Sequence, residues 1–431
     1  MTERYPLRPI TPDEFDAYCE VPIQAFNDSD RSSELNDHER LVFEFDRSIA
    51  AFDGDAIVGT TAAYSFQLTV PGGITSAAGV TFVAVLPSHR RRGILSAMMR
   101  HQLADIAARG EAVAALYASE TAIYGRYGYG CASWQLSLTI RRGEGTLSPA
   151  VTGGTGAGGA GGNGGGSGHG PVRLRAAPPD DVRAELAKVY DAAVPHRPGM
   201  IARDERWWQS VLDDTELRRG GMSTRKCLLA GDDAGPRGYA LYRTKPDWDD
   251  DGLPWAGLSL RELIATDAEA TAALWTDLLT RDLVGEVAAR QRPVDDPLLD
   301  MLADRRRARP YLYDGLWVRL VDVGAALRQR RYSCPADLVI EVTDDLLPAN
   351  AGRWRLQCPG PADGGTPSCE RTRAAADIVL PVTALGAGYL GGARLGALAA
   401  AGLVTERKEG AVARLSAAMY SDPAPWCPSM F

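Results

Sequence analysis

The hydrophobic pattern is most regular in the first third of the chain, where it predicts a strand, a loop, a helix and a second strand. Residues 80–85 form a β-branched, apolar run that is typical of a buried strand. This strand stops at Leu86-Pro87, and proline disfavours helical conformation in the residue that precedes it. Apolar residues recur at three- and four-residue steps over residues 94–108, which predicts an amphipathic helix that ends near Gly110. Residues 112–117 are predicted to form the next strand.

The loop between the first strand and the helix has the sequence Arg90-Arg91-Arg92-Gly93. Backbone N–H groups at the start of a helix have no partner within it, and the helix dipole places partial positive charge there. Gly93 permits close approach of a ligand to the backbone, and the arginines add fixed cations. The loop therefore indicates a cofactor that carries phosphate. An arginine-rich surface loop before an ordinary helix explains these residues equally well.

Two predicted hairpins precede this unit. Residues 48–53 and 56–66 alternate as two strands across a short turn, and residues 68–70 and 74–80 flank a second turn at Pro71-Gly72-Gly73. Together with the loop and helix, these strands predict one mixed α/β domain.

A tract made almost entirely of glycine follows at residues 153–170. It has no apolar surface to offset the entropy of ordering, so we expect a disordered linker. Beyond it, residues 258–265 predict a strand and Thr266 begins the next helix. That helix starts with the carboxylates of Asp267 and Glu269, which would repel a pyrophosphate. A second α/β unit is therefore expected, without a cofactor loop.

The last part of the chain again alternates between strands and apolar helices. Strands are predicted at residues 317–320, 338–342, 352–358 and 376–380, and helices at residues 382–389 and 392–401. The length of 431 residues favours two or three domains. The predicted fold class is α/β (α+β), with a domain at residues 1–145, a glycine-rich linker at 146–171, a second domain at 172–315 and a third at 316–431.

Composition excludes several classes of protein. The net charge of −8 argues against nucleic-acid binding, which requires a basic surface. Seven cysteines and five histidines are scattered without zinc-ligand spacing, so we expect no metal site and reduced thiols in a cytoplasmic protein. No apolar run approaches 18 residues, and the first residues lack the apolar core of a secretory signal. We therefore expect neither a membrane span nor export.

The arginine loop resembles the acyl-CoA loop of the GNAT N-acetyltransferases, written [Q/R]-x-x-G-x-[G/A]. Arg90 and Gly93 match this motif, whereas Leu95 stands where a small residue is usual. The longer strings FVAVLPSHRRRGILSAMM and ALYASETAIYGRYGYG are similar to the Eis (enhanced intracellular survival) branch of the family. The resemblance extends to Phe431 and leaves out only the glycine tract. It implies tandem GNAT-like domains, a sterol-carrier-protein-like third domain, and an N-acetyltransferase that uses acetyl-CoA and no metal.

The resemblance places acetyl-CoA in the first domain. It implies that the backbone of Val83 and Val85 pairs with the pantetheine arm, and a bulge in this strand would expose N–H groups to the thioester carbonyl. Ordinary strand core also explains both valines, and the two interpretations are compatible because one uses side chains and the other uses backbone. The other implied cofactor-binding residues are Phe82, Arg90, Arg91, Gly93, Ile94 and Ser119.

The resemblance also implies two catalytic residues. Tyr124 is the implied general acid, although Tyr124, Tyr127 and Tyr129 are otherwise interpreted as packing aromatics on a glycine-rich turn. The implied general base is the α-carboxylate of Phe431, which is ionised at neutral pH like any terminal carboxylate. Termini usually fray, but the proline- and aromatic-rich ending differs from a solvated tail. Glu120 is equally well explained as a surface or capping residue.

Phe26 and Phe82 are candidate walls of an amine pocket, and Asp28 or Asp30 are candidate partners for a cationic group. Met430 departs from relatives that carry an acid at this position. The resemblance implies direct transfer, in a ternary complex, to a substrate with several amines, such as an aminoglycoside or a protein lysine. It further implies a homo-hexamer built from two trimers.

Two alternatives remain open from the sequence. The first is transfer of a longer acyl chain, because N-myristoyltransferases also combine tandem GNAT units with a C-terminal carboxylate. The second is a catalytically inactive lipid-binding or scaffold protein, whose lipid cavity would be lined by the apolar helices of the third domain. Plain core packing is the preferred explanation of those helices.

Overall fold

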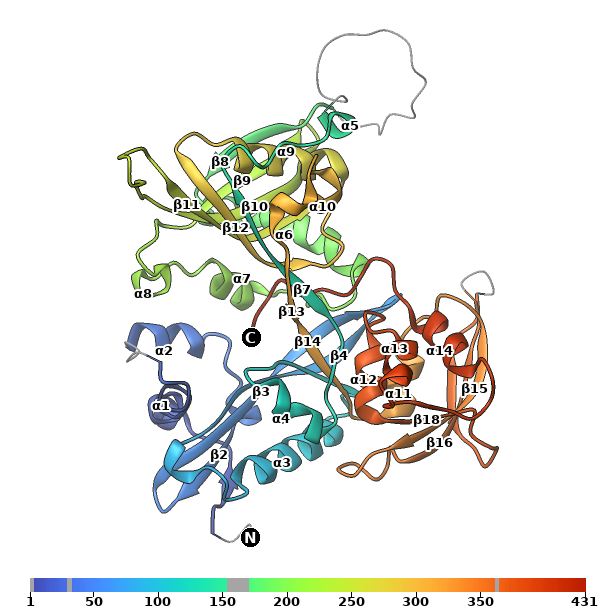
Figure 1. The fold of residues 1–431 in the computed structure, drawn as a ribbon. Coiled ribbons are helices and arrows are strands. Elements are labelled where there is room, and N and C mark those ends of the chain that lie inside the picture. Colours follow the sequence, from blue (N-terminus) through green and yellow to red (C-terminus); the bar gives the residue numbers. More distant parts are fainter. Residues whose placement is uncertain (1–3, 29–32, 153–169, 361–363) are drawn as a thin grey trace. The chain divides into compact units, whose positions relative to one another are not determined.

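The computed structural model describes residues 4–28, 33–152, 170–360 and 364–431 (Figure 1). Asp30 and residues 153–169 of the predicted glycine-rich linker lie outside this part of the chain. The chain divides into two compact units. The first contains Met1–Trp134, Arg197–Ala202 and Asp314–Phe431, and the second contains Gln135–His196 and Arg203–Tyr313.

A seven-stranded sheet with the order β1-β2-β3-β4-β5-β14-β6 forms the N-terminal part of the first unit. Its strands are β1 (Leu7–Arg8), β2 (Ile49–Asp53), β3 (Ala56–Val70), β4 (Gly73–Val85), β5 (Val113–Tyr117), β14 (Leu316–Leu320) and β6 (Gly130–Cys131). The strands predicted separately at residues 56–66 and 68–70 form one continuous strand, β3. Those predicted at residues 74–80 and 80–85 likewise form one strand, β4. In β3 the exposed residues Ser65 and Gln67 alternate with buried neighbours, so the strand pattern is not interrupted there.

Helices α1 (Phe15–Phe26) and α3 (Ile94–Ala108) bury their apolar side chains against this sheet. The helix predicted over residues 94–108 is confirmed with these bounds. Met98, Met99 and Ile106 of α3 are fully buried, as the three- and four-residue spacing requires. The shorter helices of this region are α2 (Ser33–Arg40) and α4 (Thr121–Tyr124), the latter continued by a 3-10 turn, η4 (Gly125–Tyr127).

Strand β14 comes from the far end of the sequence, and it is the orange strand among the blue and teal strands of Figure 1. It pairs antiparallel with β5 on one side and with β6 on the other. We expected residues 317–320 in the third domain and residues up to 145 in the first. The structure instead places β14 in the first sheet and β7 (Trp134–Arg141) in the sheet of the second unit. A local pattern predicts that a strand forms but does not select its partner.

The rest of the first unit is a five-stranded sheet covered by helices, with the strand order β17-β16-β15-β18-β19. The strands are β15 (Ala336–Thr343), β16 (Gly352–Cys358), β17 (Ser368–Arg371), β18 (Ile378–Pro381) and β19 (Thr405–Glu406). The helices are α11 (Val323–Gln329), α12 (Val382–Tyr389), α13 (Leu395–Ala400) and α14 (Ala411–Met419). Helix α12 contacts β6 closely, because a Cβ atom on Gly130 would lie 2.0 Å from the Thr383 carbonyl oxygen.

The second unit contains a seven-stranded sheet with the order β13-β7-β12-β11-β10-β9-β8. Its remaining strands are β8 (Arg173–Ala177), β9 (Lys226–Asp232), β10 (Gly235–Lys245), β11 (Ala256–Ala265), β12 (Val284–Pro293) and β13 (Tyr311–Asp314). Its helices include α6 (Arg183–Ala193), α7 (Glu205–Leu212), α8 (Glu216–Arg219), α9 (Ala268–Thr280) and α10 (Leu298–Met301). Trp275 of α9 is fully buried in the core beside the sheet.

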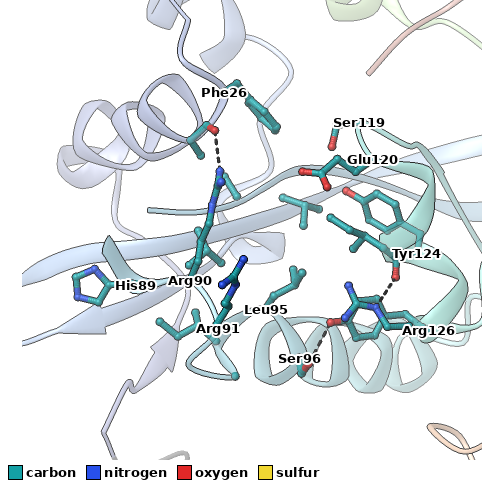
Figure 2. Close-up of a pocket in the computed structure, with 18 residues that line it drawn as sticks. Phe26, His89, Arg90, Arg91, Leu95, Ser96, Ser119, Glu120, Tyr124 and Arg126 are labelled. Atoms are coloured by element: carbon teal, nitrogen blue, oxygen red, sulfur yellow. Dashed lines mark hydrogen bonds between the residues drawn. The ribbon is translucent and has the colours of Figure 1, made fainter. Parts of the chain in front are cut away.

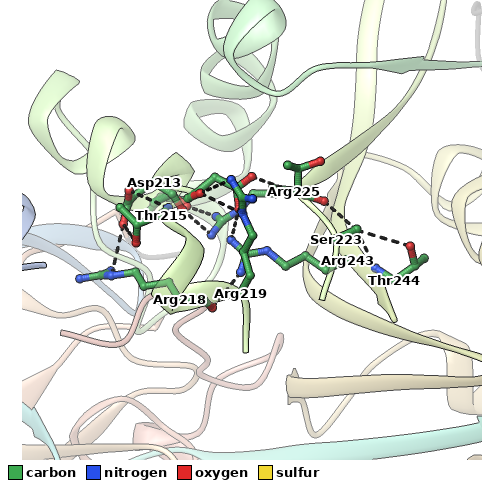
Figure 3. Close-up of polar contacts among 11 residues, drawn as sticks. Asp213, Thr215, Arg218, Arg219, Ser223, Arg225, Arg243 and Thr244 are labelled. Carbon is green, nitrogen blue, oxygen red and sulfur yellow. Dashed lines mark hydrogen bonds and ion pairs between the residues drawn. The ribbon is translucent and has the colours of Figure 1, made fainter. Parts of the chain in front are cut away.

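Arginine side chains bind the polypeptide backbone around α8 (Figure 3). Arg219 donates to the Asp214 carbonyl oxygen at 2.7 Å, and Arg243 donates to the Arg218 carbonyl oxygen at 2.9 Å. Burial, followed by repulsion from Arg243, lowers the pKa of Arg225 to about 10. Carbonyl groups at helix ends have no partner within the helix, so these arginines stabilise the α7–α8 connection.

The position of β14 predicts that residues 1–145 do not fold alone. The isolated fragment lacks the strand between β5 and β6, so we expect no cooperative thermal unfolding transition by circular dichroism. A chain that joins residues 1–134 to residues 314–431 restores this strand and should unfold cooperatively. A cooperative transition of the short fragment alone would show that β14 is dispensable for folding.

Candidate active site

A pocket of about 390 Å³ lies in the first unit, at the ends of β4 and β5 and the start of α3 (Figure 2). Three segments of the chain form its walls: the end of α1, the end of β4 with the loop into α3, and the residues after β5. The lining residues are Ala25, Phe26, Val83, Ala84, Val85, His89, Arg90, Arg91, Gly93, Ile94, Leu95, Ser96, Ser119, Glu120, Ile123, Tyr124, Arg126 and Tyr127.

Strands β4 and β5 separate as they approach the pocket. Among the described residues they pair in parallel only where Ala77–Gly79 lies beside Val113–Ala115. Strand β4 then continues to Val85 and β5 to Tyr117 without further pairing to each other. Backbone groups on this side of β4 are therefore available to an elongated ligand that carries amide groups, because such a ligand can pair with them as a strand does.

A β-bulge lies in β4 at this opening. Thr60 opposes Ala84, whereas Ala62 opposes Thr81, so β4 has one residue more than β3 over this interval. A bulge leaves a residue unpaired and increases the local twist of the strand. It therefore changes the direction of β4 where the strand enters the pocket.

Phe82 is the residue that adopts the strained backbone of this bulge. Its φ is +53°, in the left-handed region that residues other than glycine rarely occupy. Its carbonyl oxygen accepts a hydrogen bond of 2.7 Å from Thr60 Oγ1. Its ring contacts Tyr18 and Phe43, at centroid distances of 5.8 and 5.5 Å. Phe82 thus shapes the strand while its ring lies in an aromatic core.

The start of α3 combines an uncapped helix terminus with a preceding arginine-rich loop. Gly93, with φ +84°, takes the N-cap position, where it has no side chain to bind the first N–H groups of the helix. Arg90 Nη2 donates to the Ala25 carbonyl oxygen at 2.9 Å, which holds the guanidinium at the pocket wall (Figure 2). Arg92 instead binds the Tyr5 hydroxyl at 3.0 Å. The uncapped amides at the start of α3 and the Arg90 side chain therefore line the same pocket, and both kinds of group favour an anion.

Tyr124 lies on the opposite wall of the pocket from Arg90 (Figure 2) and is 4% exposed. Burial raises its pKa above the ordinary value, and the nearby Glu120 carboxylate raises it further, whereas a hydrogen bond with Ser119 lowers it. The phenol is therefore protonated at neutral pH. Tyr124 is available as a proton donor at the edge of the opening between β4 and β5.

The C-terminal residues are anchored within the first unit. Tyr117, the last residue of β5, donates from its hydroxyl to the Cys427 carbonyl oxygen at 2.9 Å. The Trp426 N–H donates to the Pro198 carbonyl oxygen at 2.8 Å. The ring of Phe431 contacts those of Phe66 and Tyr117, with centroids 4.7 and 5.5 Å apart. The chain terminus is thus held beside the end of β5, two residues before Ser119 of the pocket wall.

Most of the predicted site residues gather in this one pocket, namely Phe26, Val83, Val85, Arg90, Arg91, Gly93, Ile94, Ser119 and Tyr124. Phe82, Asp28 and Phe431 lie outside its lining. The sequence alone suggested no role for the lining residues His89, Leu95, Ser96, Arg126 and Tyr127. Ser96 could have been identified from its position one turn after Gly93 on the predicted helix. Arg126 could have been identified from its position two residues after Tyr124.

The corresponding helix start in the second unit is already occupied by side chains. Asp267 caps α9 by accepting a hydrogen bond of 2.9 Å from the Ala270 N–H. Arg237 donates to Asp267 at 2.8 Å and to Glu269 at 2.9 Å. The Asp267 carboxylate binds an amide at the start of α9, and Asp267 and Glu269 together neutralise Arg237. The start of α9 is therefore capped by side chains, whereas the start of α3 is not.

Two further observations concern the described residues. Within them, no three histidine, cysteine, aspartate or glutamate side chains form a group that could hold a metal ion. The helices found in the described ranges are too short or too polar to cross a membrane.

Family models match three parts of the chain. The description "Acetyltransferase (GNAT) domain" matches residues 6–132 and, in a second family model, residues 199–320. A sterol carrier protein domain matches residues 323–428. These matches confirm the predicted fold class of tandem GNAT-like domains followed by a sterol-carrier-protein-like domain.

Relatives match over most or all of the chain. An uncharacterised N-acetyltransferase of Streptomyces avermitilis is 44% identical over 99% of both chains. The N-acetyltransferase Eis of Mycobacterium tuberculosis is 37% identical over 86% of this chain and 84% of its own. The crystal structure of Eis1 from Mycobacterium abscessus superposes with a TM-score of 0.78 and 33% identity, over 99% of this chain and 100% of that one. The opened strands, the helix start and the buried tyrosine thus lie in a chain that belongs to the Eis branch of the GNAT N-acetyltransferases.

Proposed function

We propose that this enzyme transfers the acetyl group of acetyl-CoA directly to an amine, in a ternary complex in the first unit. The observation that carries the proposal is the convergence, in one pocket, of the separated β4 and β5 strands, the α3 start and the buried Tyr124. Bound acetyl-CoA would supply an activated acyl thioester. The residues of the pocket would bind it, orient it and move two protons.

Binding of the cofactor would use backbone more than side chains. The α3 amides after Gly93, with Arg90 and Arg91, would hold the diphosphate, because both the helix dipole and the arginines favour an anion. The backbone of Val83 and Val85 would pair with the amides of the pantetheine arm where β4 has left β5. Ser119 and Ile94 also line this path.

Two groups would move protons as the nitrogen–carbon bond forms and the carbon–sulfur bond breaks. Tyr124 would donate its phenolic proton to the departing sulfur, since burial keeps the phenol protonated. The α-carboxylate of Phe431 would accept a proton from the attacking amine. Anchoring of the tail by Tyr117 and of the terminal ring by Phe66 supports this assignment, because a general base must be held in place to act.

The acceptor side of the pocket favours a cationic amine. Phe26 lines it and is 53% exposed, which leaves its ring available for contact. Among the lining residues that the structure describes, Glu120 is the one carboxylate. Asp28, two residues after Phe26, and Phe82 remain candidate substrate residues. The resemblance to Eis enzymes leads us to include an aminoglycoside or a protein lysine as acceptor, a cytoplasmic location and a homo-hexamer in the proposal.

Binding of one cofactor per chain follows from the contrast between α3 and α9. Calorimetric titration with acetyl-CoA should give one site, and the double variant Arg90→Glu, Arg91→Glu should weaken binding by about 10- to 100-fold, since a hydrogen bond to a charged group contributes about 1.5–3 kcal/mol. The single variants Arg90→Glu and Arg100→Glu form a matched pair, because Arg90 lines the pocket before α3 whereas Arg100 lies on the exposed face of α3. Arg100→Glu should change affinity by less than about 2-fold. Two equivalent sites per chain would disprove the prediction that α3 binds the cofactor and α9 does not.

The second prediction of this subsection concerns Tyr124. Its protonated form is active and is lost as pH rises through its pKa, which burial has raised, so kcat should decline only above about pH 10. Tyr124→Phe should lower kcat by about 10²- to 10⁴-fold and remove that decline. Tyr129→Phe is the matched control, because the buried Tyr129 hydroxyl has no hydrogen-bond partner in the described part of the chain. Equal losses of kcat in both variants would show that the Tyr124 hydroxyl contributes to packing and not to proton donation.

The third prediction concerns Phe431. Amidation of its α-carboxylate, with no added residue, should lower kcat by about 10²- to 10⁴-fold, the usual effect of losing a general base. Affinity for acetyl-CoA should be unchanged, because the aromatic contacts of Phe431 do not involve the α3 start. Normal turnover of the amidated enzyme would assign the base to another group, with Glu120 the first to test.

A further inference from the structure

The turn that carries Tyr124 lies against the sterol-carrier-like part of the first unit. Thr383 of α12 donates from its hydroxyl to the Gly125 carbonyl oxygen at 3.4 Å. Five residues further along, the Gly130 backbone is so close to α12 that a Cβ atom would meet the Thr383 carbonyl oxygen at 2.0 Å. The segment after Tyr124 is therefore fixed at both ends by contacts with this region.

A buried ion pair lies beneath the middle of this segment. Arg319 of β14 is fully buried and donates through Nη2 to both carboxylate oxygens of Asp344, at 2.8 and 2.7 Å. Asn350 donates to the same carboxylate at 3.0 Å, and Arg319 Nη1 donates to the Leu320 carbonyl oxygen at 3.2 Å. The pair thus has several polar partners on both sides, which holds the guanidinium in one orientation.

Gly128 rests directly on this guanidinium. Its φ is +82°, and an added Cβ atom would lie 2.7 Å from Arg319 Cζ, so a side chain does not fit here. The adjacent Tyr129 donates from its N–H to the Tyr124 carbonyl oxygen at 3.2 Å. The two tyrosine rings contact edge to face, with centroids 6.2 Å apart. A displacement of Arg319 would therefore also displace Tyr124, through Gly128 and Tyr129.

Asp344 also places apolar residues around Tyr124. Its Oδ1 atom accepts hydrogen bonds from the N–H groups of Leu346 and Leu347, both at 3.1 Å. Leu346 and Leu347 pack against the hydrophobic cluster that contains Tyr124 and Tyr129. One carboxylate therefore fixes both the guanidinium under the turn and the side chains beside the tyrosine.

We propose that the Arg319–Asp344 pair is a positioning device, which sets the place of the Tyr124 hydroxyl for proton donation. Arg319 and Asp344 are positioning residues, because they act through Gly128, Tyr129 and the two leucines. This inference rests on the proposed role of Tyr124 as the acid. A buried ion pair contributes little net stability compared with an apolar pair of similar size, so stability alone does not account for it.

The test variant is Asp344→Asn, which removes the charge and keeps the size of the side chain. We expect kcat to fall by about 10- to 100-fold, as small displacements of catalytic groups do, with KM for acetyl-CoA unchanged. Because a loosened turn admits water, the pKa of Tyr124 should decrease and the alkaline decline of kcat should move to lower pH. Asp344→Glu, which keeps the charge, should recover part of the activity.

A matched control is present in the second unit. Arg203 donates to the two carboxylate oxygens of Glu262 at 3.0 and 2.6 Å, and both side chains are as deeply buried as those of the first pair. Glu262→Gln should lower the melting temperature as Asp344→Asn does, but leave kcat and its pH profile unchanged. The same kinetic change in Glu262→Gln would overturn the proposal, because general destabilisation would then explain it.

The decisive comparison uses the Tyr124→Phe background. If Asp344 acts through the Tyr124 hydroxyl, Asp344→Asn should cause little further loss of kcat there. A full additional loss would overturn the inference while leaving Tyr124 as the acid. If the Tyr124→Phe enzyme turned over at the normal rate, Tyr124 would not be the general acid. That result would contradict the proposed function itself and is distinct from a failure of the positioning inference.

A second variant covers the case in which Asp344→Asn does not fold. Gly128→Ala leaves both charged residues in place but displaces the turn, because the added Cβ meets the guanidinium and the residue must hold a positive φ. It should reproduce the lower kcat and the earlier alkaline decline with unchanged KM for acetyl-CoA. Wild-type kinetics in a folded Gly128→Ala enzyme would overturn the proposal.

Discussion

The separation of β4 from β5 is the constraint on which the rest of this site depends. Backbone N–H and C=O groups that lose a ladder partner must be satisfied by another group, and after Gly79 the end of β4 has no such partner in β5. The bulge at Phe82 gives β4 its new direction, and a left-handed residue of this kind is unfavourable by about 1–3 kcal/mol. Packing of its ring against Tyr18 and Phe43 offsets this strain. Under our proposal, the amide groups of the bound cofactor would complete the pairing that the fold leaves open.

The sequence predicts those features of the site that are determined by residues close together along the chain. Helix α3 was predicted with its observed bounds because its apolar spacing and Gly110 act within a few turns. The arginine loop and Tyr124 were identified from contiguous strings. In contrast, the strand predicted at residues 317–320 was assigned to the third domain, whereas β14 lies between β5 and β6 in the first sheet. The apolar pattern predicts that these residues are extended but does not select their partner strands. Contacts such as that of Tyr117 with Cys427 join residues more than 300 positions apart, and no periodicity encodes them.

The two GNAT-like sheets differ at the start of the helix that follows the bulged strand. Strand β11 also has an extra residue relative to β10, between Leu260 and Glu262, so the bulge is common to both sheets. The difference lies at the following helix. Gly93 leaves the α3 amides uncapped, whereas Asp267 accepts from an α9 amide and is itself bound by Arg237. A carboxylate in place of a glycine thus reverses the electrostatic preference of the same backbone element.

Under our proposals, the chain from β14 onward would contribute to both proton transfers. The terminal carboxylate would be the base, and the Arg319–Asp344 pair would place the acid. Such a role would account for a charged pair at a place where an apolar pair would stabilise the fold equally well. A guanidinium with fixed hydrogen-bond directions holds Gly128 in one position, whereas aliphatic side chains adapt their rotamers and tolerate small shifts. Proton transfer is more sensitive to such shifts than folding is, so geometry, and not net stability, would maintain this pair.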